Sequence, residues 1–181
     1  GEGGVPHSSG TPERVLRASE TLVVDLFPRG GLFADCTRTF CVGDPPEAVA
    51  TAHRAVREAL QLAHAAARPG ARGWDLQVAV CEAFSARSYP TPLSEPGTLQ
   101  GYVHGLGHGV GFELHEFPSF KRHTEGEGLL AVGDRAQLDV LGDLHPSGSS
   151  RAARSQSHVR ILLLRRARAG GGRSTRRSCG P

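Results

Sequence analysis

The segment Tyr102–His115, with the sequence YVHGLGHGVGFELH, holds the chain's densest group of candidate metal-binding side chains. His104, His108 and His115 fall within twelve residues, and glycines alternate along the segment. Glycine lets the backbone approach closely whatever lies between the imidazoles, and histidine is the commonest metal ligand. A single histidine is usually structural, but three in this setting indicate a functional site. Glycines with β-branched and aromatic interruptions predict a strand and a tight turn.

Two earlier segments predict a β-hairpin. Thr21–Leu26 (TLVVDL) and Leu32–Val42 (LFADCTRTFCV) each have strand composition, and PRGG at 28–31 is typical of a turn. Asp25 and Asp35 can then point to one side of the hairpin, because side chains alternate along a strand. Together they could hold one or two divalent cations. Taken alone, the pair is better explained by a strand-end Asp25 and an ion pair of Asp35 with Arg38.

Helices and further short strands follow the hairpin. The sequence GDPP at 43–46 starts a helix whose apolar residues recur at steps of three and four until Pro69 and Gly70. A second helix is predicted over Asp75–Arg87, and a Pro/Gly-rich loop over 88–101. Two more strands are predicted, around Ala136–Leu138 and over Val159–Leu164.

Composition limits the classes of protein. The 181 residues suffice for one domain, and no apolar run reaches the roughly 18 residues that span a bilayer. Four cysteines without CxxC spacing favour a reducing, cytoplasmic compartment. Residues 1–143 contain 12 Lys and Arg against 18 Asp and Glu, and nine Arg follow. The segment 165–181, rich in Arg, Gly and Ser, predicts disorder. Its nonspecific binding to nucleic acid is the least favoured function.

Three blocks resemble the pita-bread metallopeptidases, the group of Xaa-Pro aminopeptidases, prolidases and methionine aminopeptidases. The blocks are VVDLFPR, FADCTRTFCVGDPP and YVHGLGHGVGFELHEFPSF, and the resemblance covers about residues 5–142. It implies an α+β, creatinase/aminopeptidase-like fold with a curved, mostly antiparallel sheet and backing helices. We expect an incomplete domain of this kind over residues 1–164 and a tail over 165–181.

The resemblance also implies a metal site. The family holds two divalent ions (Mn, Co or Zn) with two Asp, one His and two Glu, and here the site could hold only one. Its ligands map onto Asp25, Asp35 and His108, with Asp139 in place of the longer Glu. An ordinary polar residue near a strand end explains Asp139 equally well. Leu162 stands where the fifth ligand is expected.

Three histidines would complete the site by resemblance. His104 and His115 would be catalytic, binding substrate or stabilising the oxyanion. His7 would bind substrate, although an exposed loop residue explains it equally well. Asp25 and Asp35 are ten positions apart, where the family has eleven or more. A one-residue slip turns a side chain to the other face of a strand unless a bulge or tighter turn absorbs it.

The function implied by resemblance is hydrolysis of the N-terminal peptide bond of short, proline-containing peptides by a hydroxide held between two metals. The expected protein is cytoplasmic, binds neither membrane nor specific nucleic acid, and could form a homodimer. An inactive remnant that binds a peptide or protein is the alternative, because Leu162 has no carboxylate. The loss of acidic residues after Asp143 suggests a reading-frame shift, which an uninterrupted frame in independent clones would contradict.

Overall fold

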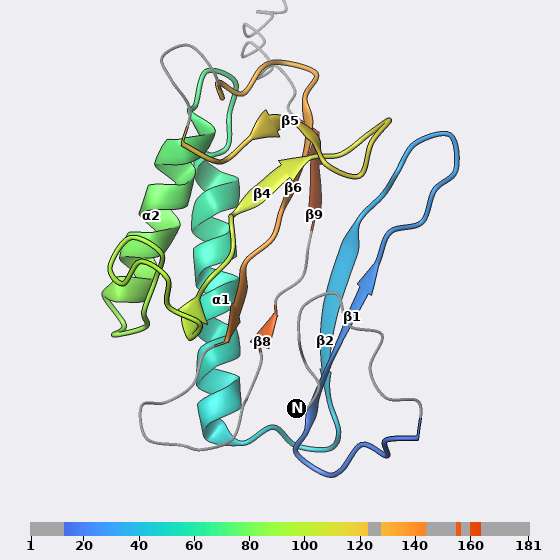
Figure 1. Ribbon diagram of the computed structural model, residues 1–181, viewed down its shortest axis with the longest axis vertical. Coiled ribbons are helices and arrows are strands. Elements are labelled where there is room, and N and C mark those ends of the chain that lie inside the picture. The colour runs from blue at the N-terminus through green and yellow to red at the C-terminus, as the bar shows by residue number, and fades with distance from the viewer. Residues whose placement is uncertain (1–12, 123–127, 144–154, 157–159, 164–181) are drawn as a thin grey trace, which may run out of the picture.

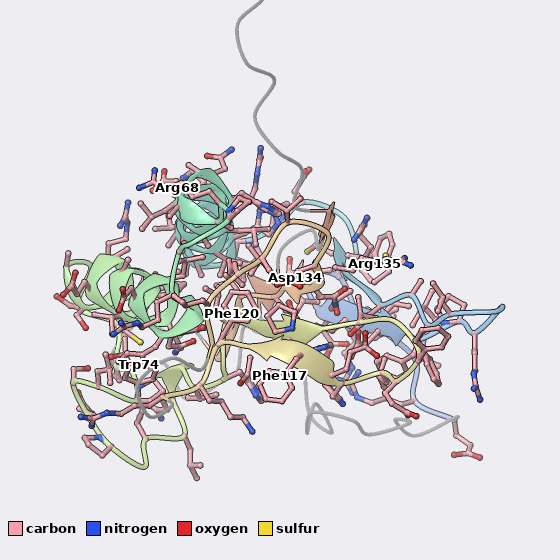
Figure 2. The ribbon with its side chains drawn as sticks, turned by 90° about the horizontal axis from the view of Figure 1, so that it is seen from above. Arg68, Trp74, Phe117, Phe120, Asp134 and Arg135 are labelled. Carbon is pink, nitrogen blue, oxygen red and sulfur yellow. The ribbon has the colours of Figure 1, made fainter. Side chains whose placement is uncertain are left out.

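The computed structural model describes residues 13–122, 128–143, 155–156 and 160–163 (Figure 1). Two helices lie to one side of a group of short strands, and a separate β-hairpin lies to the other side, in both views (Figures 1 and 2). All strand pairs among these residues are antiparallel. The predicted α+β class is therefore confirmed.

The hairpin consists of β1 (Thr21–Leu26) and β2 (Cys36–Cys41). β1 matches its predicted bounds, whereas β2 begins four residues later than predicted. The connection over 27–35 is longer than the expected tight turn, because its backbone also bonds outside the hairpin. Phe33 N donates to the Gly111 carbonyl at 2.7 Å, which ties the connection to the histidine-rich segment.

The core lies between the two helices and the strands beside them. α1 (Glu47–Ala66) and α2 (Gly73–Ser85) agree with the predicted helices to within two residues at most ends. α1 ends before Pro69, and Gly70 turns the chain with a positive φ of 87°. The buried face of α1 is rich in alanine, and these alanines belong to the same core cluster as the buried residues of α2. The aromatic ring of Phe84 stacks on Tyr102 with centroids 5.1 Å apart. Fully buried members of this core include Val56, Val80, Leu106, Phe120, Leu130 and Leu138.

The central sheet has the strand order β5–β4–β6–β9. Its members are β5 (Glu116–Ser119), β4 (Gly107–Gly109), β6 (Arg135–Leu138) and β9 (Arg160–Leu163). A smaller sheet has the order β3–β7–β8, from β3 (Gly101–Tyr102), β7 (Leu141–Asp143) and β8 (Ser155–Gln156). β4, β6 and β9 confirm predicted strands, whereas β5, β7 and β8 were not predicted.

The two phenylalanines at β5 differ in burial. Phe120, immediately after β5, is 1% exposed in the core, whereas Phe117 in β5 is 70% exposed; Figure 2 labels both. The predicted disorder of 165–181 concerns residues outside the described part of the chain. None of the described helices is both long and apolar enough to cross a membrane.

Candidate metal centre

The hairpin register places Asp25 and Asp35 on one side. Asp25 pairs with Thr37 across the ladder, and Asp35 lies two residues before Thr37. Directly opposed residues and residues two apart share a face, so the three side chains project together. The ten-residue spacing therefore leaves the two carboxylates on one face, because Asp35 lies two residues before Thr37, the partner of Asp25. Thr37, which is fully buried, donates its hydroxyl to Asp25 Oδ1 at 2.5 Å.

His108 lies in β4 and meets the hairpin carboxylates. Its Nε2 is 3.4 Å from Asp35 Oδ2. Its Nδ1 is 2.9 Å from the Gly109 carbonyl, which can only accept, so Nδ1 carries the hydrogen. Burial by itself lowers the pKa of His108, but the bonds to Asp35 and Gly109 and the nearby carboxylates raise it overall. Nε2 therefore faces Asp35 with either a proton or a free lone pair for a metal.

Asp139 follows β6 and completes the group. Its backbone N donates to the Leu106 carbonyl at 2.6 Å, which fixes its place beside β4. Burial first, and then the negative charges of Asp25 and Asp35, raise its pKa from 3.8 to about 8, and His108 opposes this. Because such charge effects act over short distances, all four predicted ligands share one neighbourhood.

This neighbourhood suits a cation. Asp35 Oδ1 and Asp139 Oδ1 are buried without a hydrogen-bond partner, and buried carboxylates without partners are costly. Carboxylate oxygens and a neutral imidazole are donors for Mn, Co or Zn. Among the described residues, no three His, Cys, Asp or Glu side chains stand close enough to hold an ion as placed. The candidate ligands therefore lie in one neighbourhood, but as placed they are too far apart to coordinate one ion together.

The glycines of the histidine-rich segment allow the close strand packing around His108. A Cβ at Gly107 would lie 2.1 Å from the Gln137 carbonyl oxygen, and one at Gly109 would lie 2.0 Å from the Phe117 carbonyl oxygen. Neither carbonyl can move without breaking the sheet. Glycine is therefore needed on both sides of His108 for β4 to fit between β5 and β6.

The remaining predicted residues have fewer described contacts with Asp25, Asp35, His108 and Asp139. The exposed His115 ring lies 4.2 Å from the His108 ring, centroid to centroid, at 63°. His104 is half-buried in the segment between β3 and β4. His7 lies outside the described residues. Leu162 pairs with Ala136 in the β9–β6 ladder.

Two residues of this neighbourhood were missed from the sequence. Thr37 orients Asp25, and Gln137 lies directly opposite His108 in the ladder. The sequence did carry a pattern that could have identified them. Each lies two positions from a predicted ligand, Asp35 or Asp139, and residues two apart along a strand share a face. Without the register, however, nothing marked them as different from ordinary strand residues.

Comparison with known proteins identifies the family of this chain. The model of the family described as metallopeptidase family M24 matches residues 1–137. The chain belongs to metallopeptidase family M24. The Xaa-Pro dipeptidase of Pyrococcus furiosus is 33% identical over 125 residues, which cover 67% of this chain and 32% of the relative. The chain thus spans about a third of the length of that curated M24 relative.

Solved structures confirm the fold. The prolidase from Pyrococcus furiosus superposes with a TM-score of 0.70 at 25% identity, over 89% of this chain and 43% of that one. Dipeptidase PepE from Mycobacterium ulcerans gives 0.69 at 26% identity, over 90% of this chain and 40% of that one. The M24 chain therefore has the predicted pita-bread fold, whereas the proposed division at residue 164 stays a prediction.

Proposed function

We propose that this M24 chain is a metal-dependent peptidase that removes the N-terminal residue of short peptides, of the Xaa-Pro dipeptidase or aminopeptidase type. The observation that carries the proposal is the shared neighbourhood of Asp25, Asp35, His108 and Asp139, with two buried carboxylate oxygens lacking partners. Such a group is costly to keep without a cation. A bound cation offsets that cost and relieves the repulsion among the carboxylates.

The metal and the protein would contribute different parts of the chemistry. Divalent ions supply Lewis acidity, which lowers the pKa of water and polarises a peptide carbonyl. The residues that would hold them are Asp25, Asp35, His108 and Asp139, with two ions or one. His108 would be oriented through its Nδ1 bond to the Gly109 carbonyl, as histidine ligands usually are.

Proton transfer and substrate contacts would fall to nearby groups. Asp139 has a pKa of about 8 in the absence of metal, so it can hold and release a proton near neutral pH. His115 is exposed beside His108, where an entering peptide can reach it. His104 and His115 would bind the peptide or stabilise the oxyanion, and His7 would bind substrate. Proline beside the scissile bond is proposed because relatives are named Xaa-Pro dipeptidases.

The test begins with metal binding by the full chain. After chelation, the protein is reloaded with Mn, Co or Zn, and bound metal, melting temperature and hydrolysis of Xaa-Pro dipeptides are measured. Asp35→Asn and His108→Ala should lose both the metal and the activity. Asp44→Asn, an exposed carboxylate before α1, is the matched control and should retain both.

The outcomes separate the candidates. Specific metal binding with hydrolysis, lost in the two site variants, supports the peptidase. A folded protein that binds none of the three metals refutes it. That result would direct attention to the alternative, a pita-bread module that binds peptides without cleaving them.

A further inference from the structure

Gln137 is a buried amide without a hydrogen-bond partner. Its side chain is 0% exposed, and neither Oε1 nor Nε2 has a partner. Buried side-chain amides in folded proteins are nearly always bonded, so such an exception needs a physical reason. Gln137 is thus a polar side chain placed where an apolar one would pack at lower cost.

Gln77 shows what a satisfied buried glutamine in this protein looks like. It is 5% exposed in the helical core. Its Oε1 accepts from the Tyr102 hydroxyl at 3.1 Å and from Leu106 N at 2.6 Å. Its Nε2 donates to the sulfur of Cys81 at 3.5 Å. The fold therefore gives one buried glutamine partners at both its oxygen and its nitrogen, and the unpaired amide of Gln137 is specific to its position.

The sheet register places Gln137 at the candidate metal centre. It lies directly opposite His108 across the β4–β6 ladder. Asp139 follows it by two residues, and residues two apart along an extended strand share a face. Gln137 therefore projects from the same face as His108 and Asp139. The buried Asp139 Oδ1 that lacks a partner lies on this side as well.

The groups on this face indicate what the Gln137 amide can bind. Three carboxylates and one imidazole face the site. We propose that Gln137 supplies its carboxamide oxygen as an additional, neutral ligand to the divalent cation held by Asp25, Asp35, His108 and Asp139. Side-chain carbonyl oxygens of this kind bind hard divalent cations. The inference rests on the proposed metal-dependent function.

A ligand role explains both unpaired amide atoms. Oε1 lacks a donor because its partner is the cation, and Nε2 is then available to donate to a carboxylate oxygen. A purely structural amide would have its partners within the fold, as Gln77 does. We therefore expect opposite effects on the stability of the metal-free protein when each glutamine is changed to leucine, which has a similar volume and no polar side-chain atoms.

The test uses the full chain, stripped of metal and titrated with Mn²⁺. Gln137→Leu should raise the melting temperature of the metal-free protein by about 3 °C, because an unsatisfied amide is removed. It should also weaken Mn²⁺ binding by about tenfold or more. Water proton relaxation should show one additional water on the bound Mn²⁺. Gln77→Leu, the control, should lower the melting temperature and leave Mn²⁺ affinity within about twofold.

Gln137→Glu provides a second, independent readout. A carboxylate at this position should lower the melting temperature of the metal-free protein, through repulsion by the neighbouring carboxylates, and should tighten Mn²⁺ binding. The inference is overturned if Mn²⁺ binds wild type and Gln137→Leu equally. It is also overturned if Gln137→Leu lowers the metal-free melting temperature as Gln77→Leu does. Absence of Mn²⁺ binding by folded wild type overturns both the inference and the proposed function.

Discussion

Asp139 makes the stability of the metal-free protein depend on pH in a direction unusual for a carboxylate. Burial and the charges of Asp25 and Asp35 raise its pKa from 3.8 to about 8. Between these values the folded protein keeps a proton that the unfolded chain has released. The free energy of unfolding is therefore highest below about pH 4 for this group, and this contribution is lost as the pH rises to about 8.

The magnitude follows from the shift. Within this window each pH unit lowers the free energy of unfolding by up to about 1.4 kcal/mol. The full value is an upper bound, because part of the side chain is exposed and the neighbouring carboxylates share the proton. From about pH 5 to pH 6 we therefore expect a loss of about 1 kcal/mol. The pKa of His108 is also raised, so its effect has the same sign, but it begins only near its ordinary value of 6.5.

Urea unfolding in the presence of a chelator measures this dependence. Wild type should lose stability between pH 5 and pH 6, whereas Asp139→Asn, whose amide does not ionise, should not. Asp44→Asn changes an exposed carboxylate and should keep the wild-type slope. A wild-type stability that is flat or rises over this interval would refute the reasoning. So would an equal slope in Asp139→Asn. Saturating Mn²⁺ should reverse the wild-type slope, because a metal favours the ionised carboxylate.

Two further substitutions, one of them with a matched control, test the packing of β4 and the orientation of Asp25. Gly109→Ala should destabilise the protein by about 3 kcal/mol or more, because its Cβ would lie 2.0 Å from the Phe117 carbonyl oxygen. Gly105→Ala in the same segment has no heavy atom within 4 Å of its Cβ and should change the free energy of unfolding little in the same urea titration. Thr37→Val removes the hydroxyl that holds Asp25 and should weaken Mn²⁺ binding about tenfold in a chelator competition. An unchanged affinity in that folded variant would show that Asp25 is oriented without Thr37.

The predicted parts of the fold are those whose sequence carries its own periodicity. α1 has apolar residues at helical spacing between proline-containing ends, and β1 has a run of β-branched residues before a turn. The placement of Asp25 and Asp35 on one side of the hairpin was also predictable, because alternation along two strands decides which residues share a face. These features depend on local chemistry that remains the same in any tertiary environment.

The missed parts depend on distant partners. β7 has three residues and β8 has two, and strands this short form only through pairing with neighbouring strands. The length of the hairpin connection was mispredicted for the same reason, since Phe33, which also pairs with Arg29 inside the connection, donates its N–H to Gly111 outside the hairpin. From the sequence pattern alone, Gln137 could not be distinguished from an ordinary polar residue in a strand. Its side chain is 0% exposed, and β6 lies between β4 and β9, neither of which the local pattern around Gln137 reveals.

The candidate metal centre depends on the register of the strands more than on any single sequence motif. β4 lies between β5 and β6 only because Gly107 and Gly109 admit neighbouring carbonyls at distances that no Cβ would allow. That packing places His108 opposite Gln137, and it brings β6 and Asp139 beside the hairpin carboxylates. A side chain added at either glycine would therefore shift the imidazole relative to the carboxylates even if every proposed ligand were retained. The glycines contribute to the site as directly as the ligands do, because they set the distances across which a cation would be shared.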